Sequence, residues 1–421
     1  MNPTNASSPA SGPAAGASTG AAAGASAGPL TGYTVLDLTR ALAGPHAGMM
    51  LGDLGARVIK VETPGTGDDT RSWGPPFVGP EDDRQATYFL SCNRNKESIA
   101  LDLKSEEGRA TLTELVRRSD ALLENFRTGV LDRLGFSMEA LQQINPRLVI
   151  LSITGFGHDG PEAKRSGYDQ IVQGEAGLMS LTGSGPDDPQ RVGVPISDLL
   201  SGMYGAYGVL AALLEREKTG RGQVVRTSLL ASVIGVHAFQ GTRATVAGEV
   251  PRAQGNHHPS IAPYGLFACR GGNVQISVGS EKLWKALTDA FDIDASDPDF
   301  ATNADRVHHR GKLIGAIEDA FSAYDPATLL DKLNEAGVPA GKVRTLDEVY
   351  AWDQVKSQGL LLDVEHPVLG DITLPGPPLR FFDAATAEER TRTTHTAPPG
   401  LDANAAEIRA WLASDPAAGG N

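Results

Sequence analysis

The segment GYDQIVQGEAGLMSLTG, from Gly167 to Gly183, contains only two charged residues, Asp169 and Glu175. Asp169 stands directly behind a Gly-Tyr pair, at the mouth of an otherwise apolar or small-residue stretch. A carboxylate there can cap a helix, because aspartate is favoured at helix N-termini and suits the positive end of the dipole. An ionised carboxylate can also attack an activated carbonyl group as a nucleophile. The segment alone leaves both roles open.

A glycine-rich pattern, GFGHDG at Gly155–Gly160, follows a predicted strand and matches G-x-G-x-x-G. A dinucleotide site needs a helix directly after such a loop, so that the helix N-terminus meets the pyrophosphate. Here Pro161 and a polar stretch follow, and no acidic residue ends a strand about 20 residues further on. The pattern therefore favours a flexible loop near a ligand, and a nicotinamide-dependent oxidoreductase stays as a rival.

Several basic residues lie near the ends of predicted strands. If they converge on one crevice, they suit a ligand with several phosphates, whereas otherwise they are ordinary solvated charges. They are Arg40, Arg71, Arg94, Lys96, Lys104 and Arg133. The two histidine pairs lack ligand spacing and no C-x-x-C occurs, so we expect no metal site. Beyond the Ala/Gly-rich stretch at the N-terminus, neither a G-x-S-x-G elbow nor a Walker loop is present.

Strands and helices alternate along the first half of the chain, which predicts parallel βαβ units with ligand crevices at the carboxyl ends of the strands. The predicted strands are Tyr33–Leu38, Arg57–Glu62, Glu97–Leu103, Ala121–Phe126 and Arg147–Gly157. The predicted helices are His46–Ala56, Lys104–Asp120 and Ser197–Gly222, the last with small residues suited to close packing. We expect Ser105 to cap the second of these helices.

The pattern changes after the long helix. An alternating hairpin is predicted at Tyr264–Val278, with helices at Glu281–Phe291 and Arg310–Tyr324. We predict a disordered Ala/Gly-rich tail at 1–31, a large α/β domain from 32–230 and 351–415, and a smaller α+β domain at 231–350. A last helix is expected near Ala405–Leu412.

The composition limits the classes of function. The chain has 421 residues, a formal net charge of −14 and two cysteines. This acidic balance argues against a broad nucleic-acid surface, and the few cysteines suit a reducing compartment. No apolar run approaches the length of a membrane span and the N-terminus lacks targeting features, so we expect a cytoplasmic protein that does not bind membranes.

Several long motifs, in order over Leu30 to Phe382, resemble the family III CoA-transferases of the CaiB/BaiF type. They are LDLTRALAGPHAGMMLGDLGARVIKVE, GDDTRSWGPPF, NRNKESIALDLKSEEGR, LLENFRTGVLDRLGF, INPRLVILSITGFGHDGP and GYDQIVQGEAGLMSLTG. With PSIAPYGLF, they look most like the branch that transfers CoA from succinyl-CoA to dicarboxylates such as glutarate or hydroxymethylglutarate. The resemblance implies a Rossmann-like large domain built from both chain ends, a smaller domain and an interlocked homodimer.

The resemblance also implies an activity and site residues. Asp169 is expected to attack an acyl-CoA, giving an aspartyl anhydride and then an aspartyl-CoA thioester, before an acceptor acid reverses the exchange. CoA is a substrate rather than a tightly bound cofactor. Its implied contacts are the turn from Arg40 to Ala43, Lys104, Asn125 and Arg133.

Two alternatives of other classes remain. In a racemase of the α-methylacyl-CoA type, Asp169 transfers a proton, but Tyr168 stands where the resemblance places histidine in racemases, which favours transfer. A CoA-binding protein without turnover is the other alternative. A dicarboxylate acceptor needs a partner for its far carboxylate, for which Arg71 and His258 are the candidates.

Overall fold

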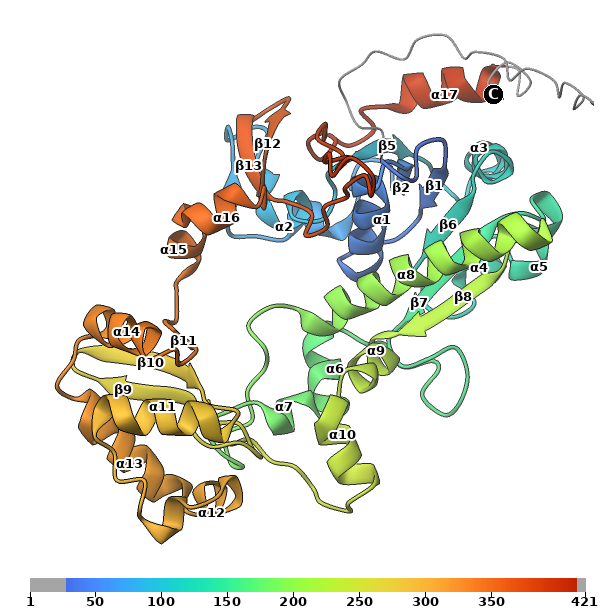
Figure 1. Cartoon of the computed structure of the whole chain (residues 1–421). Coiled ribbons are helices and arrows are strands. Elements are labelled where there is room, and N and C mark those ends of the chain that lie inside the picture. Colours follow the sequence, from blue (N-terminus) through green and yellow to red (C-terminus); the bar gives the residue numbers. More distant parts are fainter. Residues whose placement is uncertain (1–27, 415–421) are drawn as a thin grey trace, which may run out of the picture.

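A six-stranded parallel sheet forms the centre of the computed structural model, which describes residues 28–414 (Figure 1). In spatial order its strands are β5 (Lys96–Ala100), β2 (Arg57–Glu62), β1 (Thr34–Asp37), β6 (Ala121–Glu124), β7 (Val149–Thr154) and β8 (Val224–Ser228). All neighbouring strands are parallel, which confirms the predicted sheet. The chain winds outward in one direction from β1 and in the other from β6. This doubly wound order places a topological switch point between those two strands.

The inner strands are apolar runs because both faces of the sheet are covered. All four residues of β6 are buried, as are the first five of β7. The edge strand β8 was not predicted. Its sequence VVRTS alternates between exposed and partly buried positions, and only Ser228 is buried. Such a short, mixed strand carries a much weaker pattern than a central strand.

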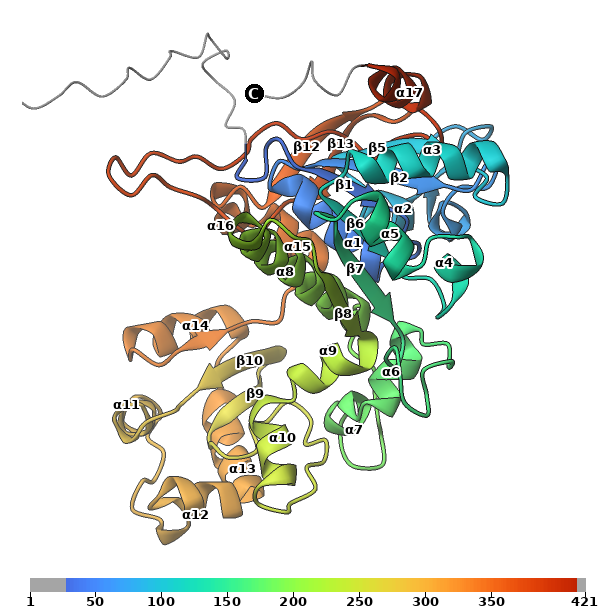
Figure 2. The ribbon, with the colours of Figure 1, turned by 90° about the vertical axis from the view of Figure 1, so that its right-hand side faces the viewer.

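Helices cover the two faces of the sheet. α1 (Ala43–Asp53) and α8 (Ile196–Thr219) pack on one face, and α3 (Glu106–Arg117), α5 (Met138–Ile144) and α17 (Ala405–Ala413) on the other. Alternate strand residues serve the two cores: Leu123 joins the α1–α8 side and Leu122 the α3–α17 side. Figure 2 shows α17 and α8 on opposite sides of the sheet. The C-terminal helix therefore packs on a sheet made from the N-terminal half.

Local signals explain where the main helices begin and how they pack. The Ser105 side chain accepts a hydrogen bond from the Gly108 N–H and caps α3, as predicted. In α8, a Cβ at Gly202 would lie 2.6 Å from the Ala43 carbonyl oxygen, and a Cβ at Gly205 would lie 2.7 Å from Leu151. Glycine therefore lets α8 approach both α1 and the sheet.

Among residues 28–414, α8 is the one helix long and apolar enough to cross a membrane. Its contacts with α1, β7 and β8 are those of a core helix.

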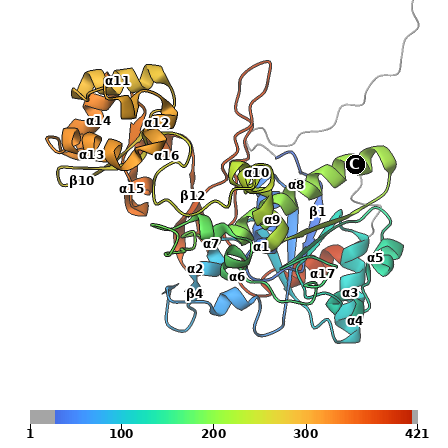
Figure 3. The same cartoon turned by 90° about the horizontal axis from the view of Figure 1, so that it is seen from below.

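A second, three-stranded antiparallel sheet lies to one side of the first (Figure 3). It contains the predicted hairpin, β9 (Tyr264–Cys269) and β10 (Gly272–Ser277), together with β11 (Ala340–Gly341). Around it lie α11 (Glu281–Phe291), α12 (Asn303–His308), α13 (Arg310–Phe321) and α14 (Pro326–Glu335). These elements share a hydrophobic cluster of their own, which includes Phe267, Leu287 and Phe321. The chain passes between the two sheets twice, before β9 and after β11 (Figure 1).

The remaining elements are short. They are β3 (Phe77–Val78), β4 (Gln85–Ala86), β12 (Leu361–His366), β13 (Gly370–Pro375), α2 (Thr87–Leu90), α4 (Val130–Arg133), α6 (Asp169–Glu175), α7 (Leu178–Leu181), α9 (Leu229–Gly235), α10 (Ala238–Thr245), α15 (Leu346–Ala351), α16 (Asp353–Ser357), and the 3₁₀ turns η1 (Asp69–Ser72) and η2 (Pro298–Phe300). Most escaped prediction because one or two turns are too few to show a helical period. Most of the predicted tail at 1–31 lies outside the described residues.

Candidate active site

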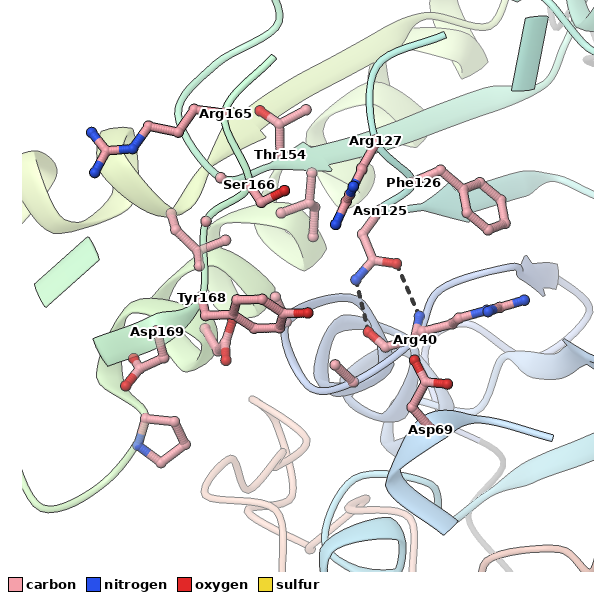
Figure 4. Close-up of a pocket in the computed structure, with 18 of the residues that line it drawn as sticks. Arg40, Asp69, Asn125, Phe126, Arg127, Thr154, Arg165, Ser166, Tyr168 and Asp169 are labelled. Carbon is pink, nitrogen blue, oxygen red and sulfur yellow. Dashed lines mark hydrogen bonds between the residues drawn. The ribbon is translucent and has the colours of Figure 1, made fainter. Parts of the chain in front are cut away.

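A pocket of about 620 Å³ lies at the carboxyl ends of the central strands (Figure 4). Its walls are the segments that follow β1, β6, β7 and β8, together with the start of α8. Because β1 and β6 diverge at the switch point, their following loops leave a crevice there. The pocket therefore lies where the predicted βαβ topology places a ligand site.

Asn125 joins the two loops across the switch point. Its Oδ1 accepts a hydrogen bond of 2.9 Å from the Arg40 N–H, and its Nδ2 donates one of 2.7 Å to the Arg40 carbonyl (Figure 4). The Arg40 guanidinium donates to Thr63 Oγ1 and lies 6.0 Å from the centre of the Phe126 ring. Asn125 thus holds the backbone of the turn after β1, with one amide hydrogen left for a ligand.

Four of the six predicted site residues line this pocket, namely Arg40, Ala43, Asn125 and Asp169. Lys104 and Arg133 are exposed and lie outside its lining. Lys104 follows β5 just before α3, and Arg133 is the last residue of α4, the helix that begins at the pocket residue Val130.

Asp169 is held on both carboxylate oxygens. Its Oδ1 accepts hydrogen bonds from the Ser197 N–H at 2.8 Å and the Ser197 hydroxyl at 2.5 Å. Its Oδ2 accepts one of 2.7 Å from the Gln173 side chain, whose own oxygen accepts from the Val192 N–H. The carboxylate is therefore fixed by three donors.

These contacts refine the capping interpretation of Asp169. The residue that caps α6 is Tyr168, and Asp169 is the first residue inside that helix. Its side chain instead reaches Ser197 in the first turn of α8, where backbone N–H groups have no partner within the helix. Asp169 is thus a capping group for the long helix rather than for its own.

A second carboxylate, Asp198, lines the same pocket one residue beyond Ser197. Among residues 28–414 its carboxylate makes no hydrogen bond or ion pair. Burial and the nearby Asp169 charge raise the pKa of Asp198 to about 7. Burial also raises the pKa of Tyr88, another lining residue, to about 12, with Asp198 contributing. Asp198 is thus a poorly solvated carboxylate whose oxygens have no hydrogen-bond or ion-pair partner in the described residues.

Apart from Arg40, the basic residues that line the pocket are not those expected from the sequence. Arg127 and Lys164 line it and, within the described part of the chain, their side chains make no hydrogen bond or ion pair. Arg165 also lines it but is paired with Glu175, and in Figure 4 its side chain extends away from Asn125. Two cations thus remain available for an anionic ligand.

Neither candidate partner for a second carboxylate reaches the pocket. Arg71 forms a two-pronged ion pair with Glu62 and lies 3.7 Å from the Phe89 ring centre. His258 is stacked between Phe239 and Tyr264 beside the second sheet.

The glycine loop after β7 contributes only its first member to the pocket, Gly155. A Cβ on Gly155 would lie 2.6 Å from the Cα of Gly167, so the loop is closed at its base by two glycines. The next helix, α6, begins only at Asp169. The loop therefore lacks the direct strand-to-helix turn that a dinucleotide fingerprint requires.

Sequence reasoning missed Asp198, Arg127, Lys164 and Tyr88. A signal for Asp198 was present, because Ser197 was predicted to begin a long helix and an acidic residue in the first turn often has a role at the helix N-terminus. The other three lie in irregular or short segments whose position only the fold determines.

A doubly wound sheet with a pocket of aspartates and free cations at its switch point defines an α/β enzyme that binds its ligand at the strand ends. A model of CoA-transferase family III matches residues 30–404. The chain is 38% identical over 364 residues to the succinyl-CoA:glutarate CoA-transferase of Homo sapiens, covering 86% of this chain and 82% of that protein.

Two further proteins extend the comparison. Over 391 residues the chain is 40% identical to the acetyl-CoA:oxalate CoA-transferase of Acetobacter aceti, covering 92% of this chain and 96% of that protein. The crystal structure of a CaiB/BaiF family protein from Brucella suis matches with a TM-score of 0.80 at 40% identity, covering 91% of this chain and 99% of that one.

The chain belongs to CoA-transferase family III and is a CoA-transferase. The racemase alternative is not favoured, because these curated relatives are named as transferases.

Proposed function

We propose that this enzyme moves CoA from an acyl-CoA, such as succinyl-CoA, to a dicarboxylic acid through a covalent aspartyl intermediate. The observation that carries the proposal is a pocket that combines two aspartates with two cations, Arg127 and Lys164, that form no ion pair in the described part of the chain. The named relatives support the substrate class, since glutarate and oxalate are both dicarboxylates.

The attacking carboxylate in this proposal is Asp169, the residue that the sequence resemblance implies. Its three donors hold the carboxylate in one orientation at the pocket wall, which suits attack on a bound thioester. Asp198 lies one residue beyond Ser197, and its charge, where ionised, adds to the negative field around Asp169.

Each chemical step exchanges one acyl bond for another of similar energy. An Asp169 oxygen attacks the thioester carbonyl and CoA leaves as a thiolate, which gives a mixed anhydride. The thiolate then attacks the aspartyl carbonyl, releasing the donor acid and leaving an aspartyl-CoA thioester. The acceptor carboxylate attacks that thioester, so that CoA leaves again as a thiolate and a second anhydride forms. The thiolate then attacks the acceptor's acyl carbonyl. The products are the new acyl-CoA and a regenerated Asp169, so no ATP is needed.

The CoA contacts follow the pocket walls. Arg40, Ala43 and Asn125 line the pocket and are proposed to contact the cofactor portion of the substrate. We assign Lys104 and Arg133, which are exposed beyond the lining, to the outer phosphates of an extended CoA. Arg127 and Lys164 are available for the second carboxylate of the acceptor.

A two-domain chain in an interlocked homodimer is part of the same proposal. The second sheet has its own core, and large apolar side chains are exposed on α8 and at α10, including Tyr207, Phe239 and Val246. An exposed apolar group of this kind suits a second copy of the chain. Light scattering after size-exclusion chromatography should give twice the monomer mass, and a monomer would remove this part of the proposal.

The direct test of function is an exchange assay with succinyl-CoA and glutarate, followed by mass spectrometry. We expect glutaryl-CoA and free succinate in equal amounts, with oxalate as a second acceptor to compare. A reaction without acceptor acid, run in D₂O with a 2-methylacyl-CoA, is the control for isomerase chemistry. Deuterium at the α-carbon with no acyl exchange would contradict the proposal.

A further inference from the structure

The turn after β1 contains a backbone conformation that an alanine adopts at a cost. Ala41 has a φ of 65°, in the left-handed region that favours glycine. The residue lines the pocket together with Arg40 and Ala43. A strained non-glycine residue in a ligand site persists only where its surroundings hold it in place.

Buried charged groups hold Ala41 in this conformation. Asp68 Oδ1 accepts a hydrogen bond of 3.3 Å from the Ala41 N–H, while its Oδ2 is 2.8 Å from the Lys60 ammonium. Lys60 also donates to the Thr39 carbonyl at 2.9 Å, just before the turn. Neither the Lys60 nor the Asp68 side chain is exposed by more than 1%.

The same charges belong to a larger buried network at the ends of β1, β2 and β5. Asp37 accepts from the Thr39 N–H and pairs with Lys96 at 2.9 Å, and both of those side chains are fully buried. Although burial alone would lower it, the pKa of Lys60 is raised by Asp37, Asp68 and Glu62. Lys60 is therefore charged, and removing one of its partners would leave buried charge without compensation.

We infer that Asp68, held by Lys60, is a positioning residue that keeps Ala41 in its left-handed conformation and so preforms the wall against which acyl-CoA binds. The inference rests on the proposed function, because it takes the pocket as the CoA site. Asp68 acts through the backbone of the turn and need not touch substrate.

Asp68→Asn is a sharp probe because the amide is nearly the same size but has one acceptor oxygen. That oxygen cannot serve both Lys60 and the Ala41 N–H. Leaving a buried ammonium unpaired is the costlier choice, so the amide oxygen should turn to Lys60 and oppose an NH₂ group to Ala41. The turn then keeps its contacts with Asn125, but Ala41 loses the hydrogen bond that holds it in the left-handed conformation, and this part of the pocket wall is no longer preformed in the free enzyme.

We expect Asp68→Asn to raise the KM for acyl-CoA about tenfold while kcat changes by no more than about twofold. In the double variant Ala41→Gly/Asp68→Asn, glycine adopts the left-handed region without strain, so the KM should return to within about threefold of the wild type. A merely structural role for Asp68 would not give this rescue.

Asp53→Asn is the matched control, because Asp53, like Asp68, is a buried and ion-paired carboxylate, but its partner is Arg94 and it does not contact the turn. Circular dichroism and thermal unfolding would show that all variants fold. An unchanged KM in folded Asp68→Asn, or a double variant no better than the single one, would overturn the inference. If the wild type transfers no CoA at all, the proposed function fails instead, and the two failures are distinguished.

Discussion

The starts of α6 and α8 each bring an aspartate into the same pocket, and their surroundings differ. At the start of α6, Asp169 is bound on both oxygens by Ser197 and Gln173. At the start of α8, Asp198 lines the pocket and makes no hydrogen bond or ion pair within residues 28–414, and burial beside Asp169 raises its pKa to about 7. One carboxylate is therefore held in a single orientation by its donors, and the other is a poorly solvated group that titrates near neutral pH.

This comparison shows why residue type and local sequence are insufficient to assign a nucleophile. Both aspartates lie in the first turn of a helix, where the dipole stabilises an ionised carboxylate. What separates them is the set of donors that reach each one, and those donors come from residues distant in sequence. The following tests are ordered from the largest expected effect to the smallest.

Replacing Asp169 should have the largest effect. Asp169→Asn cannot form an anhydride, so kcat for exchange should fall by about a thousandfold or more. CoA binding, measured by calorimetry, should persist because the pocket walls are unchanged. Turnover within about tenfold of the wild type would exclude Asp169 as the nucleophile.

Replacing Asp198 should have an intermediate effect. Asp198→Asn removes a carboxylate whose charge adds to the negative field around Asp169, and it leaves the three donors of Asp169 in place. We expect kcat to change by no more than about tenfold. Complete loss of exchange in this variant, with Asp169→Asn retaining activity, would reverse the assignment of the two residues.

The ionisation of Asp198 tests the coupling between the two carboxylates. A titration of the Asp198 side-chain carboxyl carbon followed by NMR should have its midpoint near pH 7 in the wild type. The Asp169 charge helps to raise that pKa, so the midpoint should move to lower pH in Asp169→Asn. An identical midpoint in both proteins would show that the two carboxylates are not coupled.

The smallest effect concerns stability. The pKa of Asp198 is raised from its ordinary value of 3.8 to about 7, so between these values the folded state holds a proton that the unfolded state has lost. Its contribution to stability therefore declines as pH rises through this window. Asp198→Asn should raise Tm at pH 8 by about 2 °C, and by less at pH 5. A variant less stable than the wild type at pH 8 would contradict the described environment of Asp198.

Much of the fold, namely the parallel sheet, its longer helices and the hairpin, could be predicted from the sequence. Continuous apolar runs such as ALLE at Ala121–Glu124 specify strands buried on both faces, and their alternation with helices specifies a parallel sheet. The cap at Ser105 and the hairpin at Tyr264–Val278 followed from local chemistry alone. The edge strand β8 and the short helices carried too weak a periodicity to be recognised.

The site was only partly predictable. Arg40, Asn125 and Asp169 were placed in one pocket by the strands that precede them, as the topology suggested. Which oxygens are occupied was beyond the sequence, because Asp169 meets Ser197 through a contact 28 residues away along the chain. For the same reason the sequence did not predict the hydrogen bond from the Ala41 N–H to Asp68. That contact depends on the buried salt bridge between Asp68 and Lys60.

The most direct test of the central claim is to trap the covalent intermediate. The protein would be incubated with succinyl-CoA and hydroxylamine, digested and mapped by mass spectrometry. Hydroxylamine converts an activated carboxyl group to a hydroxamate about 15 Da heavier than the acid, which marks covalent catalysis. We expect this adduct on Asp169 and none on Asp198. An adduct on Asp198, or none on either residue while exchange proceeds, would contradict the proposed mechanism.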